Sequence, residues 1–262
     1  MTTHLNLNIE NGIATVALNR PEVHNAFDDQ LIAELVATFK ALDTREDVQV
    51  LVLTSEGKHF SAGADLNWMK RMATLTEDQN RDDANALAEL MYILNSMSMP
   101  TIAKINGAAY GGAVGLIACC DMAVATERSR FCLSEVKIGL SPAVISPFVV
   151  AAMGQRQARR YFLTGEVFDT QTAIGFDLIH EMAKDEDELD EKVSTLASAC
   201  ASNSPQAMSK TKKLIERVAR GAIDDDMRAY TVNLIAAIRV SEQGQEGLSA
   251  FLEKRSPNWQ RG

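Results

Sequence analysis

Two glycine-containing turns and one glutamate are the residues of this sequence whose types and spacing suggest chemistry. The first turn lies in His59-Phe-Ser-Ala-Gly-Ala-Asp65, and the second, Gly111-Gly112, lies in the stretch Ala103–Glu135. Such turns can direct two backbone N–H groups at one oxygen atom, which is the arrangement of an oxyanion hole. We therefore expect acyl-thioester chemistry, in which negative charge develops on a carbonyl oxygen.

Glu135 is the residue expected to carry the proton in that chemistry. It lies in the run Phe131-Cys-Leu-Ser-Glu135-Val-Lys-Ile, where its neighbours are largely apolar. A carboxylate partly removed from water has a raised pKa, and a pKa near the working pH suits a group that both accepts and donates a proton. The alternative interpretation is an exposed glutamate on a loop.

Two carboxylates and several large apolar side chains are expected to have supporting roles. Asp65 follows the first turn and Asp121 follows Cys120, so both carboxylates are interpreted as braces for the loops that carry them. Trp68 is either part of the core or a wall of the acyl pocket, and the same choice applies to Met69, Met72, Met91 and Met97.

The elements that must position the two turns alternate between strand and helix in the first half of the chain. Alternating or β-branched runs predict strands, and Asn11-Gly12 predicts a hairpin turn. The expected strands are Leu5–Ile9, Ile13–Leu18, Val48–Leu53, Thr101–Ile105 and Met122–Ala125, with helices over Asp28–Leu42, Glu77–Met97 and Ala113–Cys120. This pattern predicts an α/β core.

The second half is expected to be mostly helical, because apolar residues recur at helical spacing after Pro142. The expected helices are Ala143–Met153, Gln155–Phe162, Thr170–Ile174, Glu186–Ala201, Pro205–Arg220, Ile223–Val240 and Gly244–Leu252. A strand-rich core with a helical C-terminal part follows from this pattern.

Composition excludes several classes of protein. The 262 residues are 46% hydrophobic and 23% charged, which is ordinary for a globular protein, and the net charge of −9 argues against nucleic acids and anionic membranes as partners. No apolar run reaches the roughly 20 residues of a membrane span. The N-terminus resembles no targeting signal, so a cytoplasmic location is expected. The four cysteines lack metal-ligand spacing and are expected to be free thiols, with no metal site.

Several ordered motifs give the chain a specific resemblance. They are Leu18-Asn-Arg-Pro21 with Asn25-Ala26, Phe60-Ser-Ala-Gly-Ala-Asp65, Ile105-Asn-Gly107 with Gly111-Gly112, Cys120-Asp121, Phe131 through Pro142, and Phe251-Leu-Glu-Lys-Arg255. They span nearly the whole chain, which resembles the enoyl-CoA hydratase/isomerase (crotonase) family. The resemblance implies an α/β fold, with a crotonase-like spiral of ββα units and the acyl-CoA site over residues 1–200. It also implies a C-terminal helical trimerisation region over residues 201–262.

The same resemblance implies partners and site residues. The partner is an acyl-CoA thioester, and no separate cofactor is needed because coenzyme A is part of the substrate. The chain would form a homotrimer or a dimer of trimers. The N–H groups of Ala64 and Gly112 would form the oxyanion hole, and Glu135 would move a proton at C2. Further substrate contacts fall on Glu22, Val23, His24, Ala62, Asp65, Leu66, Gly111, Gly115 and Pro142, and coenzyme A contacts on Phe251 and Lys254, from the same or a neighbouring subunit.

Position 115 departs from the family pattern. Many hydratases of the family carry a second glutamate three residues after the second oxyanion glycine, but this chain reads Gly112-Ala-Val-Gly115. One option is that Glu135 serves both the water and C2. A second is that another residue or a substrate group orients the water, and a third is that the reaction needs no water.

The run from Phe131 to Val150 resembles bacterial hydratases of 3-methylglutaconyl-CoA and isohexenylglutaconyl-CoA, which also lack the second glutamate. The leading expectation is therefore addition of water to the 2,3 double bond of a branched glutaconyl-CoA, whose distal carboxylate orients the water. The alternatives are a general enoyl-CoA hydratase, a Δ3,Δ2-enoyl-CoA isomerase that uses the single glutamate, and a non-enzymatic protein that binds acyl-CoA or RNA.

Overall fold

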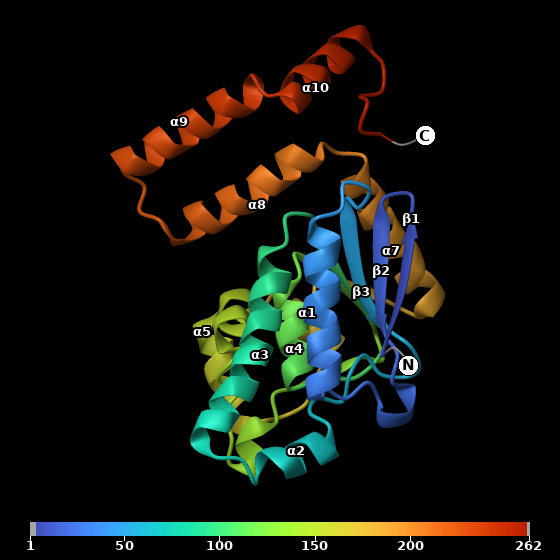
Figure 1. Ribbon diagram of the computed structural model, residues 1–262, viewed down its shortest axis with the longest axis vertical. Coiled ribbons are helices and arrows are strands. Elements are labelled where there is room, and N and C mark those ends of the chain that lie inside the picture. Colours follow the sequence, from blue (N-terminus) through green and yellow to red (C-terminus); the bar gives the residue numbers. More distant parts are fainter. Residues whose placement is uncertain (1–3, 261–262) are drawn as a thin grey trace.

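A six-stranded sheet lies at the centre of the computed structural model, which describes residues 4–260 (Figure 1). Its strand order is β1-β2-β3-β4-β6-β9. β1 and β2 form the predicted antiparallel hairpin, and the other neighbouring pairs are parallel. The strands are β1 Leu5–Glu10, β2 Ile13–Leu18, β3 Val50–Ser55, β4 Thr101–Ile105, β6 Met122–Thr126 and β9 Glu181–Ala183.

A second sheet of three short strands turns the chain into a spiral. Its order is β5-β7-β8, with β5 over Ala109–Tyr110, β7 over Arg130–Cys132 and β8 over Phe168–Asp169. The chain runs from β4 in the large sheet to β5 in the small sheet and then into the helix α4. It repeats this course through β6, β7 and α5. Each turn thus has one strand in each sheet and a helix, which is the predicted ββα unit.

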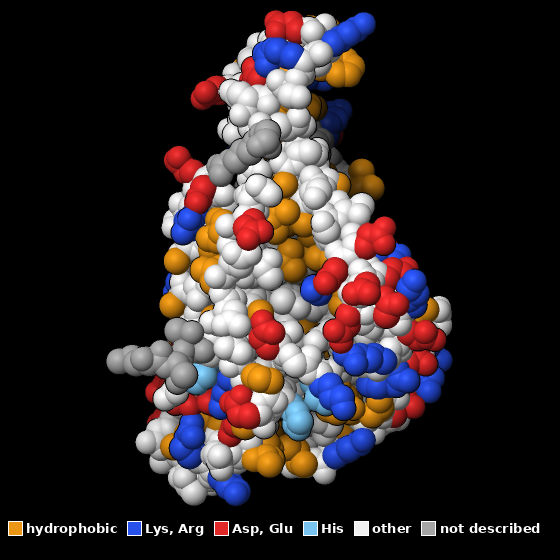
Figure 2. Space-filling model, turned by 90° about the vertical axis from the view of Figure 1, so that its right-hand side faces the viewer, with side chains coloured by type: hydrophobic (Ala, Val, Ile, Leu, Met, Phe, Trp, Pro, Cys, Tyr) orange, Lys and Arg blue, Asp and Glu red, His pale blue; other side chains and the backbone are white. Residues whose placement is uncertain are grey.

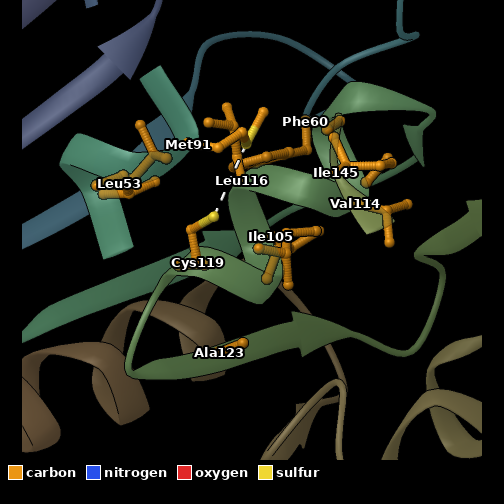
Figure 3. Close-up of a cluster of buried hydrophobic side chains, with 14 of the residues drawn as sticks. Leu53, Phe60, Met91, Ile105, Val114, Leu116, Cys119, Ala123 and Ile145 are labelled. Carbon is orange, nitrogen blue, oxygen red and sulfur yellow. Dashed lines mark hydrogen bonds between the residues drawn. The ribbon is translucent and has the colours of Figure 1, made fainter. Parts of the chain in front are cut away.

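Helices cover both faces of the large sheet (Figure 1). One face packs against α1, α3 and α4 in the main core, and the other packs against α7 in a smaller apolar cluster. Figure 3 shows part of the main core, where the thiol of Cys119 approaches the sulfur of Met91 at 3.8 Å. All four cysteines are free, as predicted. These helices are α1 Asp29–Asp43, α3 Glu77–Ser96, α4 Gly112–Cys119 and α7 Glu186–Ala201.

The remaining helices complete the two ends of the molecule. The short helix α2 lies at the end of the molecule opposite the C-terminal helices (Figure 1). Asp28 caps α1 by accepting a hydrogen bond from the Leu31 N–H. These helices are η1 Pro21–Val23, α2 Leu66–Met72, η2 Glu135–Ile138, α5 Ser146–Thr164, α6 Thr170–Ile174, α8 Pro205–Arg220, α9 Asp225–Arg239 and α10 Glu242–Glu253.

The longer predicted elements and the short helix α6 are confirmed to within a few residues, and most of the other short elements were not predicted. The missed elements include α2, β5, β7, β8 and β9, which have between two and seven residues each. Such segments are too short to show a hydrophobic period. The helix expected from Ala143 begins at Ser146, after a turn, with Pro147 in its first turn. At Gly154 the backbone leaves helical geometry, so α5 consists of two helical segments joined at a kink, and the predicted division between Met153 and Gln155 is confirmed.

The last three helices extend away from the sheet along the longest axis of the molecule (Figure 1). Lys212 of α8 ties them to the core, because its Nζ donates to the Asp121 carboxylate at 2.6 Å and to the Met99 carbonyl at 2.9 Å. Asp121 also accepts hydrogen bonds from the N–H and hydroxyl of Thr101, which confirms its predicted bracing role. Among residues 4–260, no helix has the length and apolar character of a membrane span.

Candidate active site

Glu135 begins the short helix η2 just after β7. The buried side chains of Phe131 and Leu133 hold the preceding segment in the core. The glutamate is half-buried, and its Oε2 atom is buried without a hydrogen-bond partner among the described residues. Burial raises the pKa of Glu135, and a hydrogen bond from its own backbone N–H partly opposes this rise. The direction of the pKa shift is the predicted one, and Oε2 is available to a bound molecule.

Gly111 and Gly112 connect β5 to α4 beside this carboxylate. Gly111 has φ 54° and ψ −122°, a conformation that glycine adopts far more readily than other residues. Its N–H donates to the Cys132 carbonyl at 2.9 Å. Gly112 is the first residue of α4, so its N–H has no acceptor within the helix and lies at the positive end of the helix dipole. This N–H is suited to stabilise negative charge on a ligand.

Ala64 forms a backbone bridge with Phe27. The Phe27 N–H donates to the Gly63 carbonyl at 2.7 Å, and the Asp65 N–H donates to the Phe27 carbonyl at 2.8 Å. Phe27 therefore forms its hydrogen bonds with the two residues that flank Ala64, so the N–H of Ala64 itself points to the other side. No hydrogen bond among the described residues uses this N–H.

The three predicted catalytic positions share one cavity of about 340 Å³. Ala64, Gly112 and Glu135 all line it, as does Pro142. The rest of the lining is mostly apolar, with three polar side chains: it consists of Phe27, Trp68, Met72, Asn80, Asp83, Ala84, Leu87, Ser141, Ala143, Val144 and Ile145. One acid/base and two candidate N–H donors are therefore gathered around a pocket suited to an acyl chain. Within residues 4–260, no three metal-ligating side chains come together.

Asp65 and Trp68 support the first turn and the cavity wall. Asp65 caps α2, because its Oδ1 accepts hydrogen bonds from the N–H groups of Asn67 at 2.7 Å and Trp68 at 3.2 Å. Its Oδ2 lies 3.5 Å from the Arg20 guanidinium. The Trp68 ring is buried, and its Nε1 donates to Asp83 of α3 at 3.1 Å. Asp65 therefore braces the loop, as predicted, and Trp68 is both core and pocket wall.

Other predicted substrate contacts lie outside the lining of this cavity. The Ala62 N–H donates to the His24 carbonyl at 2.9 Å, which places the turn formed by residues 22–24 beside the first glycine turn. Leu66, the first residue of α2, is 73% exposed. The positions concerned are Glu22, Val23, His24, Ala62, Asp65 and Leu66. Gly111 does not line the cavity either. It positions the N–H of Gly112, and because it has no side chain, the Glu135 carboxylate can lie close to its backbone.

Phe251 and Lys254 are not brought to the cavity within one chain. Phe251 is 81% exposed on α10, and Lys254 ends that helix. Figure 1 shows α10 and α2 at opposite ends of the longest axis. A contact between these residues and a ligand in the cavity would therefore involve a neighbouring copy of the chain.

Gly115 is covered by Ile145, a residue that the motifs did not single out. A Cβ atom built on Gly115 would lie 2.8 Å from the Cβ of Ile145, closer still to its Cγ2, and 3.2 Å from the sulfur of Met91. Ile145 therefore fills the space into which a glutamate at position 115 would project. It lines the cavity, whereas Gly115 does not. The sequence signals the replacement of an acid by Ile145 only through the unusual run after Pro142. Asp83, the second carboxylate of the lining, belongs to none of the sequence motifs.

A larger cavity of about 670 Å³ lies between the large sheet and α7. None of the predicted site residues lines it; its walls include Thr15, Gln49 and Val193. Figure 2 shows this side of the molecule, where apolar side chains gather in a hollow. The smaller cavity is therefore the candidate active site because of the residues that line it, although its volume is the smaller of the two.

The spiral fold, and a cavity that gathers Glu135 with two candidate N–H donors, are the features expected of an enzyme of acyl-thioester chemistry. The family model for enoyl-CoA hydratase/isomerase matches residues 8–262, and the chain belongs to this family.

Known proteins of this kind are similar over nearly the whole chain. A crystal structure of an enoyl-CoA hydratase from Shewanella pealeana has a TM-score of 0.95 and 49% identity, covering 98% of this chain and 96% of that chain. The enoyl-CoA hydratase ACTT6 of Alternaria alternata is 33% identical over 240 residues, which are 92% of this chain and 78% of that protein. The 2,3-dehydroadipyl-CoA hydratase of Escherichia coli is 31% identical over 250 residues, 94% of each. The predicted crotonase-like fold is confirmed, and the relatives support a hydratase-type lyase.

Proposed function

We propose that this chain adds water across the 2,3 double bond of an enoyl-CoA thioester. The observation that carries the proposal is the cavity shared by Glu135, Ala64 and Gly112. In it, the thioester carbonyl oxygen would accept hydrogen bonds from the N–H groups of Ala64 and Gly112. The acyl chain would then enter the apolar part of the cavity, with C2 near the Glu135 carboxylate.

Glu135 would carry both proton transfers. Its carboxylate takes a proton from water while the water oxygen bonds to C3, and the electron pair of the double bond moves onto the thioester carbonyl. The two N–H groups stabilise this enolate-like oxygen. Protonated Glu135 then gives the proton to C2, the carbonyl re-forms, and a 3-hydroxyacyl-CoA results. A pKa raised by burial suits this double duty, since both protonation states stay accessible near the working pH.

We infer further that the acyl group is a branched glutaconyl group, such as 3-methylglutaconyl or its isoprenoid relative. Support comes from Gly115, because it stands where many hydratases of the family carry the glutamate that helps to activate the water. The Escherichia coli relative, whose name specifies an acyl group of a dicarboxylic acid, also supports a distal carboxylate. The residues that line the cavity include no Lys, Arg or His. No ion pair from this lining would hold the distal carboxylate, which would stay free to orient the attacking water.

A Δ3,Δ2-enoyl-CoA isomerase is the second candidate, favoured by one observation. Ile145 fills the space of the second acid with hydrocarbon, which suits a reaction that needs no water. Glu135 would then remove a proton from C2 of a 3-enoyl-CoA and return it to C4, through the same enolate. A general enoyl-CoA hydratase would use the same residues on an unbranched acyl group.

A substrate panel in ¹⁸O-labelled water tests these proposals. The panel consists of crotonyl-CoA, 3-methylglutaconyl-CoA, isohexenylglutaconyl-CoA and a 3-enoyl-CoA, followed by the absorbance of the conjugated thioester and by mass. Hydration places one ¹⁸O at C3, whereas isomerisation incorporates none. We expect ¹⁸O incorporation, most efficiently with a glutaconyl ester. Equal efficiency with crotonyl-CoA would indicate a general enoyl-CoA hydratase instead of a specialised one. Turnover of the 3-enoyl-CoA alone would indicate an isomerase instead of a hydratase.

Variants connect that activity to the cavity. Glu135→Gln keeps the shape of the side chain but cannot carry the proton, so kcat should fall by roughly 100- to 10,000-fold with little change in substrate affinity. Glu127→Gln, at an exposed turn, is the matched control and should keep wild-type activity. A Glu135→Gln enzyme with more than half of the wild-type rate would overturn the assignment. Binding of acyl-CoA without turnover of any panel member would instead support the non-enzymatic alternative.

A further inference from the structure

We propose that Ile145 is the specificity-determining residue for the substituent at C3 of the acyl group. The proposal rests on the proposed function and deepens it. Ile145 precedes the first turn of α5, is 2% exposed and lines the cavity of Glu135. Its side chain can neither hydrogen-bond nor titrate, so its effect is on the shape and polarity of the wall that the substrate meets.

The position of this wall follows from the geometry of α4. Gly115 lies three residues beyond Gly112, so a side chain there would lie on the same face of the helix. The rise along the axis is about 4.5 Å for three residues. With the thioester oxygen at the Gly112 N–H, the wall over Gly115 lies beside the part of the acyl chain that begins at C3. Water must add at this carbon.

That wall is hydrocarbon, and the packing fixes it in place. The Cβ and Cγ2 atoms of Ile145 lie so close over Gly115 that no side chain fits at position 115. The sulfur of Met91 closes the space from another side. Figure 3 shows Ile145 and Met91 among the buried side chains that pack around α4. An acid at position 115 would therefore require the removal of Ile145.

A hydrocarbon wall beside C3 selects for a hydrocarbon substituent. It offers no hydrogen bond to a water molecule, but an alkyl branch on C3 would fill the space against it and displace water from apolar surface. One methyl group in such a pocket changes kcat/KM by roughly 10- to 200-fold. The water would then approach C3 from the side of Glu135, which is the acid/base of the lining with the raised pKa.

The test uses three substrates that differ only at C3: glutaconyl-CoA with hydrogen, 3-methylglutaconyl-CoA with methyl, and isohexenylglutaconyl-CoA with a long branch. Wild type should prefer the methyl over the hydrogen substrate by roughly 10-fold or more in kcat/KM. Ile145→Ala opens the wall, so this preference should fall by about that factor while the isohexenyl substrate gains relative to the methyl one. Ile145→Val, which loses only one methyl group, should shift both ratios in the same directions by a smaller amount.

The outcomes separate this inference from the proposed function. If wild type hydrates none of the three substrates, the proposed function fails. If wild type hydrates them but Ile145→Ala and Ile145→Val lower all three kcat/KM values equally, Ile145 is merely structural and the inference is wrong.

A stability measurement that does not depend on activity checks the packing. Gly115→Ala should lower the melting temperature strongly in the wild-type background, because its Cβ overlaps Ile145. The same change should cost less in the Ile145→Ala background, because the closest overlap, with the Cγ2 of Ile145, is then removed and, of the contacts with residue 145, only that with the Cβ remains. Equal losses in the two backgrounds would show that Ile145 does not occupy the space at position 115.

Discussion

The carboxylate of Glu135 lies against the backbone of Gly111, with Oε1 3.3 Å from the position that a Cβ at residue 111 would take. The left-handed backbone of Gly111 also presents the next N–H, that of Gly112, to the same cavity. One glycine therefore serves two parts of the site. It brings the acid/base close to the oxyanion position, and it turns the chain into α4.

Gly111→Ala should impair both parts. An added Cβ is strained at φ 54° and crowds the Glu135 carboxylate, so the glutamate must shift by a few tenths of an ångström or more. Misplacement on the order of 1 Å costs about 100-fold in rate. We expect kcat to fall by roughly 10- to 100-fold, together with a loss of about 1–3 kcal/mol in the free energy of unfolding.

Gly154→Ala is the matched control for backbone strain. Gly154 has φ 77° in the kink of α5, and a Cβ there would meet no atom within 4 Å. This variant should lose comparable stability but keep its kcat. If the two variants lose activity in proportion to their lost stability, the contact between Gly111 and Glu135 has no separate catalytic effect.

Glu135 should also make stability depend on pH. Burial raises the folded-state pKa above the ordinary value of 4.5, so between these two pKa values the folded chain holds a proton that the unfolded chain has released. Stability therefore falls as pH rises through this window, and the loss is complete above the folded-state pKa. Glu135→Gln has no titrating group at this position. The melting temperature of the variant minus that of wild type should therefore increase as pH rises from 4.5 to 8.

The expected gain is small, on the order of 1 °C, because solvent reaches the half-buried carboxylate. Thermal melts of both proteins at matched ionic strength and protein concentration measure it. A melting-temperature difference that stays constant, or that reverses with rising pH, would contradict a raised pKa at Glu135.

The candidate catalytic positions could be predicted because local motifs of the sequence, and the family resemblance that these motifs carry, point to them. Gly111-Gly112 is a turn that needs glycine, and Glu135 follows buried apolar residues at a fixed place after the strand, so neighbours along the chain define their environment. Ile145 could not be predicted in the same way. Its contact with Gly115 joins residues 30 positions apart in sequence, on either side of β6 and β7.

The fold shows the same division between local and tertiary signals. Long helices such as α1 and α3 have enough turns to show an apolar stripe, and the strands of the large sheet have five or six β-forming residues in most cases. The small sheet has strands of two or three residues, whose pairing depends on the packing of the spiral. The distance between the end of α10 and the cavity likewise depends on tertiary structure, so local sequence could not predict it.

Trp68 and Asp83 hold the wall of the cavity, and their hydrogen bond should affect binding more than chemistry. Trp68→Phe keeps a large ring but loses the Nε1–H that donates to Asp83 at 3.1 Å. We expect KM for the acyl-CoA to rise by roughly 3- to 10-fold, since a lost hydrogen bond costs about 1 kcal/mol, with kcat less affected. Steady-state kinetics with the best panel substrate provide the measurement.

Asp83→Asn distinguishes this role from a catalytic one. The amide oxygen can still accept the indole N–H, so the wall is preserved. This variant should keep kcat within about threefold of wild type. A loss of 100-fold or more would instead identify Asp83 as a second acid/base that replaces the missing glutamate, and the mechanism with Glu135 alone would be wrong.

Lys212 should be the residue of α8 that most stabilises the attachment of the C-terminal helices to the core. Its Nζ donates to Asp121 at 2.6 Å and to the Met99 carbonyl at 2.9 Å, and its side chain is only 17% exposed. Lys212→Met keeps the apolar stem but removes both hydrogen bonds. We expect a loss of about 1–3 kcal/mol in the free energy of unfolding.

The exposed neighbour Lys213 supplies the matched control, and Lys213→Met should stay within about 0.5 kcal/mol of wild type. Urea denaturation at one fixed protein concentration measures both variants, because association between copies would shift the apparent stability. Because the pair of Lys212 and Asp121 is partly exposed, the difference between the two variants should shrink in 1 M salt, where charges are screened beyond about 3 Å. Equal stability of the two variants at low salt would show that α8 is held by its apolar contacts and not by Lys212.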